Sequence, residues 1–526
     1  MDISIFEIIG PVMLGPSSSG TAGMARLGRA ASRFLDGEIK SIDLRFHKRN
    51  VDYAGLRSHC ALIGGLMGYE ADDPVIRESV KLAKSKGIKL TGSWFPDDAD
   101  IDGHSVGMTV VQKDGRIQRV TGASVGGGSI DIFGIDDFDV KLASTEDYLF
   151  VWSDKDISTE LLNILRSANI NSDINHDCKQ ERYLFYISVP KQFDENVLKL
   201  IKDVEGVNRV LHTEAFIEFG FVPHEPLFTG YDELMKLSEE TGKNIPELAI
   251  EYEIGRSGRS REEIYAQMSN NLKLMKECVN YGLTEELHTL FGFDPGDNAK
   301  KMLKANESGQ TLSGSTMGRA FAKAMSVMEM GESMNRIVAA PTGGSAGIVP
   351  GCILTVQEDK GFSDDKLVES LFVAAAMGVV MYYHHTSFSG MSGGCQGEIG
   401  VSSAMAAAAL AYLGGGDAKE CCHAMALAMK NILGLVCDRI GGSSEIPCTT
   451  RNCIGVGNAF AGCDMALAGI ASYVSPDNVI LALTNTQKLL PPELRGGCGA
   501  LRCTPESAKA TAIEKEICRS LALDEA

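Results

Sequence analysis

Small residues dominate the chain from Gly331 onward, where glycine-rich turns alternate with alanine-rich helical stretches. Helices without a polar face must pack closely against one another on all sides. The preceding segment, 232–278, is also helical in pattern but more charged. The pattern therefore predicts that residues 223–526 form one mostly α-helical domain with a buried core.

Residues 143–222 have a different and more regular rhythm. The pattern predicts strands at 148–152, near 170–174, at 183–189 and at 207–212, and helices at 159–168 and 196–204. The order β-α-β-β-α-β is that of a ferredoxin-like module of about 75 residues.

Residues 1–142 are predicted to form an α/β domain. They open with an apolar, strand-like run and then the turn Gly15-Pro16-Ser17-Ser18-Ser19-Gly20-Thr21, followed by a helical stretch at 22–35. Segments 108–112 and 116–121 predict a hairpin around Asp114-Gly115. The whole is an α+β multidomain chain of three domains, which agrees with about 150 residues per domain.

Composition excludes several classes of protein. The net charge is −19 and the isoelectric point is near 5.1, so the basic surface of a nucleic-acid or membrane-surface binder is missing. The longest apolar runs, 371–383 and 404–413, fall short of the roughly 18 residues of a membrane span. Residues 1–13 carry two acidic residues and no basic segment, unlike a secretory signal. We therefore expect a cytoplasmic protein with no membrane or nucleic-acid partner, whose fourteen cysteines are reduced or bind metal.

Three cysteines stand in glycine-rich, polar segments: Cys395 in 387–398, Cys437 in 434–442 and Cys448 in 445–452. Glycines let the backbone come close to a bulky cluster and offer N–H donors to its sulfides. Three thiolates on a [4Fe–4S] cluster would leave one iron as an open Lewis acid for a hydroxyl group.

A single free cysteine is most often a core residue. We apply that interpretation to Cys60, Cys178, Cys278, Cys352, Cys421, Cys422, Cys463 and Cys518, and leave Cys453, Cys498 and Cys503 open. The sequence contains no Cys-x-x-Cys pair and no P-loop signature, so it does not indicate the zinc, thioredoxin-type or nucleotide chemistry of those motifs.

The cysteine segments, with Pro341-Thr342-Gly343-Gly344-Ser345-Ala346-Gly347 before them, resemble the α domain of the iron–sulfur-dependent L-serine dehydratases. Gly15-Pro16-Ser17-Ser18-Ser19, His104-Ser105-Val106-Gly107-Met108 and Ser124-Val125-Gly126-Gly127-Gly128 resemble motifs of that family's β domain. The central module is similar to the ACT domain of the family's single-chain form, and Pro491-Pro492-Glu493-Leu494-Arg495 to its closing segment. The resemblance implies a β-like domain at 1–142, an ACT-like domain at 143–222 and an α-like domain at 223–526.

The resemblance further implies an oxygen-sensitive lyase with a [4Fe–4S] cluster on Cys395, Cys437 and Cys448. The open iron would bind the substrate's hydroxyl and carboxylate groups, and a base would remove the α-proton. Loss of water would give an aminoacrylate, which hydrolyses to a keto acid and ammonia. L-serine, giving pyruvate, is the substrate expected first. The Ser-x-Lys-x-Arg-Gly stretch usual in pyridoxal-dependent dehydratases does not occur.

Two family histidines are missing. Gly20 stands where the family's opening motif has histidine, and the family's Gly-His-Gly-Thr segment aligns best with 55–59, where His59 is out of register. The candidates for the base are therefore His104, which matches a family position, His59, and His385 with its neighbour His384. Histidine is the usual proton carrier at neutral pH, although a lone histidine is more often a surface or core residue.

Two hydroxyl-rich turns are candidate substrate contacts: Ser17, Ser18 and Ser19, and later Thr311, Ser313 and Gly314. Each turn has two interpretations, a carboxylate site or the N-cap of the following helix. Both can hold at once, because the N-terminus of a helix favours anions.

Arg451 and Asn452 match family positions beside the cysteines. A guanidinium there could bind a substrate carboxylate with two parallel hydrogen bonds. The alternative for Arg451 is a structural ion pair with Asp438 or Glu445.

Two other functions stay open. The missing histidines favour a relative acting on another β-substituted amino acid or hydroxy acid, such as cysteine or threonine. A non-catalytic amino-acid sensor would use the central module, but the turn after its first strand, 153–158, lacks the glycine of amino-acid-binding ACT modules. That reading also leaves the three cysteines unexplained. We therefore expect the module to mediate contacts in a homodimer. The molecule that the protein binds is expected to be a small amino-acid substrate.

Overall fold

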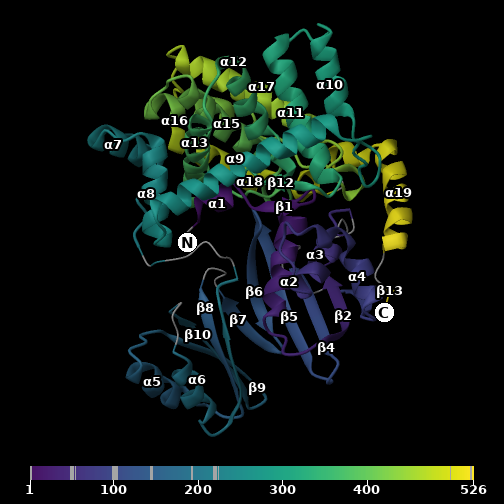
Figure 1. Cartoon of the computed structure of the whole chain (residues 1–526), viewed down its shortest axis with the longest axis vertical. Coiled ribbons are helices and arrows are strands. Elements are labelled where there is room, and N and C mark those ends of the chain that lie inside the picture. The colour runs from purple at the N-terminus through teal and green to yellow at the C-terminus, as the bar shows by residue number, and fades with distance from the viewer. Residues whose placement is uncertain are drawn as a thin grey trace.

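The computed structural model describes residues 3–47, 53, 55–96, 105–142, 146–190, 194–216, 222, 224–497, 499–521 and 524–525. Figure 1 shows a helical part, a mixed sheet beside it, and a smaller sheet with two helices at the far end of the molecule. The chain is thus mixed α/β and multidomain, with sheets ahead of a helical C-terminal part, as predicted.

The larger sheet has the strand order β13-β3-β2-β4-β5-β6-β7. β2 and β3 are parallel, and the pairs from β2–β4 to β6–β7 are antiparallel. Its strands are β2 (Ile39–Phe46), β3 (Lys89–Trp94), β4 (Ser105–Gln112), β5 (Ile117–Gly126), β6 (Ser129–Ile135), β7 (Phe138–Leu142) and β13 (Asp524–Glu525). Its helices are α2 (Met24–Ser32), α3 (Ser58–Leu66) and α4 (Ser79–Ser85), with the 3₁₀ turn η2 (Pro74–Glu78). Figure 1 shows α2 and α3 covering one face.

The first residues differ from their prediction. The apolar run forms α1 (Ile5–Ile8) and β1 (Val12–Leu14), not one strand. Ser4 and Glu7 form a capping box that starts the helix: Ser4 N–H donates to the Glu7 carboxylate, and Ser4 Oγ accepts from Phe6 N–H. β1 pairs with β12 (Arg336–Val338) of the helical part. The N-terminus therefore belongs to the packing of the C-terminal half.

The smaller sheet has the order β11-β8-β10-β9 and is antiparallel throughout. Its elements are β8 (Asp147–Ser153), α5 (Ser158–Ser167), β9 (Ile174–Lys179), β10 (Arg182–Val189), α6 (Glu195–Lys202) and β11 (Val207–Thr213). The element order is the predicted β-α-β-β-α-β, but the second strand begins at Ile174 and does not end there. The strands and helices enclose a small core of their own, built on residues such as Leu149, Phe185 and Ile201.

The helical part is organised around α15 (Ile399–Leu413), whose fifteen residues are all buried. The other long helices are α7 (Tyr231–Thr241), α8 (Ile245–Ser257), α9 (Arg261–Thr284), α10 (Asn298–Glu307), α11 (Gly314–Glu332), α12 (Ile348–Lys360), α13 (Asp364–Tyr383), α16 (Ala418–Lys430), α17 (Cys448–Leu467), α18 (Pro476–Leu489) and α19 (Pro505–Leu521). Short turns connect them: α14 (Gly390–Gly393), η3 (Gly343–Ser345), η4 (Cys395–Gly397), η5 (Ile440–Gly442), η6 (Pro492–Leu494) and η7 (Ala500–Cys503).

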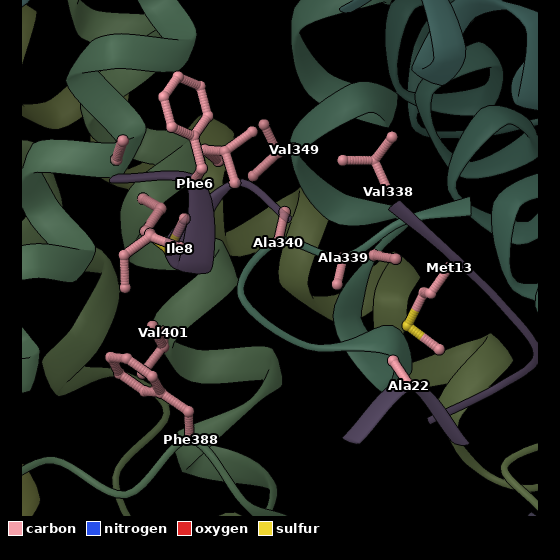
Figure 2. Packing of buried hydrophobic residues seen from close by; sticks show 14 of the residues in the cluster. Phe6, Ile8, Met13, Ala22, Val338, Ala339, Ala340, Val349, Phe388 and Val401 are labelled. Atoms are coloured by element: carbon pink, nitrogen blue, oxygen red, sulfur yellow. The ribbon is translucent and has the colours of Figure 1, made fainter. Parts of the chain in front are cut away.

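The larger sheet and the helical part share one hydrophobic cluster. Figure 2 shows Phe6 and Ile8 of α1 and Met13 of β1 beside residues of the helical part such as Val338 and Val349. The N-terminal strand and helix are thus held by apolar contacts on the side where the larger sheet meets the helices.

Among the residues that the structure describes, one helix, α13, is long and apolar enough to cross a membrane by length and composition alone. Within the molecule, 78% of its apolar window is buried, and it packs against α8, α9 and α15. A core helix of a globular domain has the same properties.

Candidate metal centre

Cys395 begins η4, the turn between α14 and α15, and its side chain is buried. Gly390 at the start of α14 leaves the space that the neighbouring groups need. A Cβ atom at position 390 would lie 2.8 Å from Cys437 Sγ and 2.5 Å from Glu398 Oε2. Gly394 has φ +75°, a conformation that favours glycine, and it turns the chain into Cys395. The glycine-rich segment therefore has a direct steric function at this site.

Cys437 follows α16 in a loop that is fixed from both sides. Its N–H donates to the carbonyl of Leu494 at 2.9 Å, and its carbonyl accepts from Gly496 N–H at 2.7 Å. Gln396 joins this loop to the first cysteine turn: its side chain accepts from Gly434 N–H, and its own N–H donates to the carbonyl of Leu435. Cys448 is the first residue of α17 and is also buried.

Two of the three thiols lie beside one carboxylate, and the third is close enough for their charges to act on it. The Sγ atoms of Cys395 and Cys437 and a carboxylate oxygen of Glu398 all lie within 4.8 Å of one another, and the charges of Cys437 and Glu398 also act on Cys448. The hydrogen bond between Cys395 and Cys437, followed by burial, raises the pKa of Cys395, while the same bond lowers the pKa of Cys437. Burial raises the pKa of Cys448. A bound metal would displace these protons.

The donor set fits an iron–sulfur cluster. Three buried thiols, a space that a Cβ at Gly390 would fill, and nearby positive charge are what a cluster of thiolate-bound iron requires. In the described part of the chain, Thr449 Oγ1 is buried beside Cys448 without a hydrogen-bond partner. A hydroxyl in that position could donate to a cluster sulfide.

Arg451 is tied to the cysteines themselves. Its Nη1 donates to the carbonyl of Val436 at 2.9 Å, lies 3.6 Å from Cys395 Sγ, and forms an ion pair with Asp438 at 2.7 Å. The structural ion pair with Asp438 is therefore present. A further contact of Arg451 with substrate stays a prediction.

Asn452 is completely buried on α17. Its amide NH₂ donates to the carbonyls of Gly344 and Cys448, at 2.9 Å and 2.8 Å, and its oxygen accepts from Gly347 N–H. Both amide hydrogens are thus used to fix the 341–347 loop to the cysteine helix. This placement favours positioning the loop, and a direct substrate contact stays a prediction.

The serine turn of the N-terminal part reaches the same loop. Ser17 Oγ accepts from Gly20 N–H at 2.9 Å, so it caps the π-helical turn η1 (Ser18–Gly23) that precedes α2. Ser18 is buried, and Ser17 and Ser19 are partly buried. A Cβ atom at Gly343 would lie 3.0 Å from Ser18 N and 2.9 Å from the carbonyl oxygen of Pro16. The turn therefore packs directly on the loop that Asn452 holds.

The side chain of Leu56 lies too close to position 20 to leave room for a histidine there. A Cβ atom on Gly20 would lie 2.5 Å from Leu56 Cδ1 and 2.9 Å from Leu56 Cβ. Ser58, at the start of α3, donates to the carbonyl of Gly20 at 2.6 Å. Leu56 thus occupies the space that a larger residue at position 20 would need.

The three candidate bases are placed differently. His59 is buried on α3, next to Ser58, with its Nε2 at 3.4 Å from Cys60 Sγ and its ring edge-on to Tyr53. His385 is exposed after the end of α13, and its neighbour His384 pairs with Asp477 at 3.1 Å. His104 lies outside the described residues. Of the two histidines that the structure describes, His59 is the one whose neighbour, Ser58, contacts the serine turn.

Thr311, Ser313 and Gly314 lie at the start of α11, in a partly to fully exposed turn. Thr311 Oγ1 donates to Asn306 of the preceding helix at 2.9 Å. The opposite end of α11 contacts the cysteine loops, and 19 helical residues span about 27 Å. The structure does not bring this turn to the cysteines, and its role in substrate binding stays a prediction.

Sequence reasoning missed two charged residues of the centre, Glu398 and Arg439. Arg439 is buried, and its charge acts on Glu398, Cys437 and Cys448. Both stand three residues or fewer from a cysteine within the glycine-rich segments. Their closeness in sequence to the cysteines was the signal that could have found them. A charged residue within a buried segment needs a partner, because charged residues are rarely buried alone.

Buried carboxyls hold the loop between Cys437 and Cys448. Glu332, at the end of α11, accepts hydrogen bonds from Ser443 and Ser444, and Glu445 accepts three backbone N–H bonds from 291–294. Burial, and next the charge of Glu445, raises the pKa of Glu332 to about 8.

Comparison with known proteins covers this region. The family model for the serine dehydratase alpha chain matches residues 240–496, which include the three cysteines. The probable L-serine dehydratase alpha chain of Bacillus subtilis is 38% identical over 292 residues, which are 55% of this chain and 95% of the relative. The L-serine dehydratase alpha chain of Peptoniphilus asaccharolyticus is 37% identical over 270 residues, 51% of this chain and 92% of the relative. An L-serine dehydratase of Streptomyces coelicolor is 33% identical over 295 residues, 54% of this chain and 61% of the relative.

Proposed function

The chain belongs to the L-serine dehydratase family, and from this premise we propose that it is a [4Fe–4S]-dependent ammonia-lyase that converts L-serine to pyruvate and ammonia. Its relatives are named for a lyase reaction on an amino acid, and the chain is an enzyme of that type. The cluster, the substrate and the roles of individual residues are the proposal. We further propose that the larger sheet and the central module correspond to the family's β and ACT domains.

The observation that supports the proposal is the group formed by the buried Cys395 and Cys437 with Glu398, whose charges also act on the buried Cys448. The three thiols would hold the cluster, with Arg451 and Arg439 compensating its negative charge. When bound, an iron without a thiolate supplies an electrophile that makes hydroxide a better leaving group.

The chain's own groups would bind and orient the substrate. The serine turn, Ser17 to Ser19, stands against the 341–347 loop and offers hydroxyls to a substrate carboxylate. Asn452 keeps that loop in register with Cys448. Burial of the centre excludes water, which strengthens each of these electrostatic contacts.

The α-proton needs an acceptor within hydrogen-bond reach of that carbon, or one water away. We propose His104 for this role. His59 is the alternative, because its neighbour Ser58 contacts Gly20 of the serine turn. A histidine in either position could carry the proton at neutral pH.

A second substrate class has one observation in its favour. Gly20 replaces a family histidine, and Leu56 fills the adjoining space. This supports a site reshaped for another small β-substituted amino acid, with threonine and cysteine as the first to test.

Two properties of the whole molecule complete the proposal. Twelve cysteines whose side chains the structure describes are free, which supports a reducing, cytoplasmic location. We propose a homodimer with contacts through the central module.

The test is anaerobic purification, with iron and sulfide counted per chain and amino acids screened for ammonia release. We expect four irons, four sulfides, and pyruvate from L-serine. Fastest turnover of threonine or cysteine would select the second class. A protein that binds no iron after anaerobic reconstitution would contradict the proposal.

A further inference from the structure

Glu398 is the acidic group of the cysteine centre. It follows the η4 turn directly and precedes α15, the most buried helix of the molecule. Its N–H donates to the carbonyl of Cys395 at 3.1 Å. This short turn returns the Glu398 side chain toward Cys395, and the backbone on both sides of it is fixed.

The carboxylate of Glu398 faces the thiols. One of its oxygens lies within 4.8 Å of both Cys395 Sγ and Cys437 Sγ. Among the residues that the structure describes, these three form the one group of three or more histidine, cysteine or carboxylate ligands with such spacing. Carboxylate oxygen is an accepted ligand of iron in proteins, alongside thiolate and imidazole.

The carboxylate is packed against two glycines. A Cβ atom at Gly390 would lie 2.5 Å from Oε2, and one at Gly344 would lie 3.4 Å from Oε1. Glycine at position 390 is therefore required for the carboxylate to lie where it does, beside Cys437. Glu398 is also partly accessible, unlike the neighbouring cysteines, so a small molecule that reaches the centre can reach it too.

Charged and polar groups surround the carboxylate, and their effects on it oppose the effect of burial. Burial raises the pKa of Glu398, whereas the charges of Arg439 and Arg451, the Thr342 hydroxyl and the Gly390 N–H oppose that rise. An anionic oxygen beside two thiolates would be strongly repelled unless a cation lay among them. A purely structural ion pair with Arg439 would not require the carboxylate to face both sulfurs.

We propose that the Glu398 carboxylate is a fourth protein ligand of the metal centre, bound to the iron that the three cysteines leave without a thiolate, and that substrate displaces it. This inference rests on the proposed function. It gives the open iron a protein oxygen in place of water while no substrate is present, which protects that iron from loss.

The test uses the anaerobic holoenzyme without substrate, reduced by one electron so that the cluster is paramagnetic, in water enriched in the magnetic oxygen isotope. Electron–nuclear double resonance detects labelled water on the cluster. We expect no water coupling in the wild type and a clear coupling in Glu398→Ala and Glu398→Gln. The control is Glu329→Gln, a buried glutamate of the same helical part that does not face the thiols.

A second readout is the rate at which ferricyanide removes the fourth iron, followed by electron paramagnetic resonance of the three-iron product. We expect a rise of roughly tenfold or more in the Glu398 variants, the scale of lost ligand support, and no change in Glu329→Gln. Water coupling in the wild type would overturn the proposal even if the variants failed to fold. Iron and sulfide counts on the same samples separate the two claims: an intact cluster with bound water refutes the Glu398 ligand alone, and a protein without a cluster refutes both.

Discussion

The cysteine centre and the N-terminal face that meets it are constructed in different ways. The centre comes from one part of the chain, and its loops are joined by side-chain hydrogen bonds from Gln396, Arg451 and Asn452. The N-terminal face meets the centre mainly through close backbone approaches, such as Ser18 against Gly343 and Gly55 against Gly442. The proposed cluster ligands and the proposed substrate contacts therefore lie on separate segments. Under this proposal, Gly20 can differ from the family residue while the three cysteines remain.

The largest expected effect comes from removing one of the three cysteines proposed to bind the cluster. Cys395→Ser, Cys437→Ser or Cys448→Ser should each abolish the brown chromophore and the activity, because serine does not replace thiolate toward iron. Iron content, visible absorption and turnover measure the result. Cys453→Ser, on the same helix as Cys448, is the control and should keep both. A full cluster in all three single variants would remove these cysteines as ligands.

The second-largest expected effect is a loss of turnover while the cluster at the cysteine centre stays intact. His104→Asn should preserve the cluster spectrum but lower kcat by roughly 10²-fold or more, the scale of a lost general base. His59→Asn is the matched comparison from the serine-turn side. If kcat is unchanged in His104→Asn and falls strongly in His59→Asn, the general base is His59 on α3 and not His104.

Placing the family's histidine at position 20 tests whether the N-terminal face can change independently of the cysteine centre. Gly20→His must displace Leu56, since even a Cβ there lies 2.5 Å from Leu56 Cδ1. Such overpacking costs about 1–3 kcal/mol in unfolding free energy. We expect lower thermal stability, unchanged iron content and no gain in serine turnover, with Leu56→Ala in the same chain relieving the instability. Much faster serine turnover in Gly20→His would instead indicate a weakened serine site, not a reshaped one.

The smallest effect concerns the loop between Cys437 and Cys448. Because the pKa of Glu332 is raised to about 8 from 4.5, the folded protein keeps a proton that the unfolded chain releases. Stability should therefore fall as pH rises between about 5 and about 8, by at most about 1.4 kcal/mol per pH unit from this group. Glu332→Gln should flatten that slope in the reduced, metal-free protein, measured by denaturant unfolding. An identical slope in the variant would show that Glu332 is ionised in the folded state.

Much of the fold could be predicted from local pattern. The alternation of strands and helices from Tyr148 to Thr213 was visible because the elements other than β9 have clear apolar periodicity. β9 was misplaced because it is an exposed edge strand with the polar sequence Asn175-His176-Asp177-Cys178 after Ile174. α1 was missed although Ser4 and Glu7 carry the capping-box signal, since the apolar residues around them suggested a strand.

The site was less accessible to sequence reasoning. Glycine-rich surroundings pointed to the three cysteines, and the structure places Cys395 and Cys437 beside one carboxylate; the full ligand set stays a prediction. The placement of Glu398 depends on a turn of three residues and on two missing side chains, at Gly344 and Gly390, which no spacing rule describes. Asn452 matched a motif, but its hydrogen bonds across 105 and 108 positions are set by tertiary packing alone.

The central claim is that these three cysteines hold a cluster whose fourth iron meets the substrate. Mössbauer spectroscopy of the enzyme reconstituted with Mössbauer-active iron, with and without L-serine, tests it directly. The account predicts four irons per chain and a change in the signal of one iron when substrate binds, with the other three unaltered. The claim would be contradicted if no iron signal changed on addition of any substrate that the enzyme turns over.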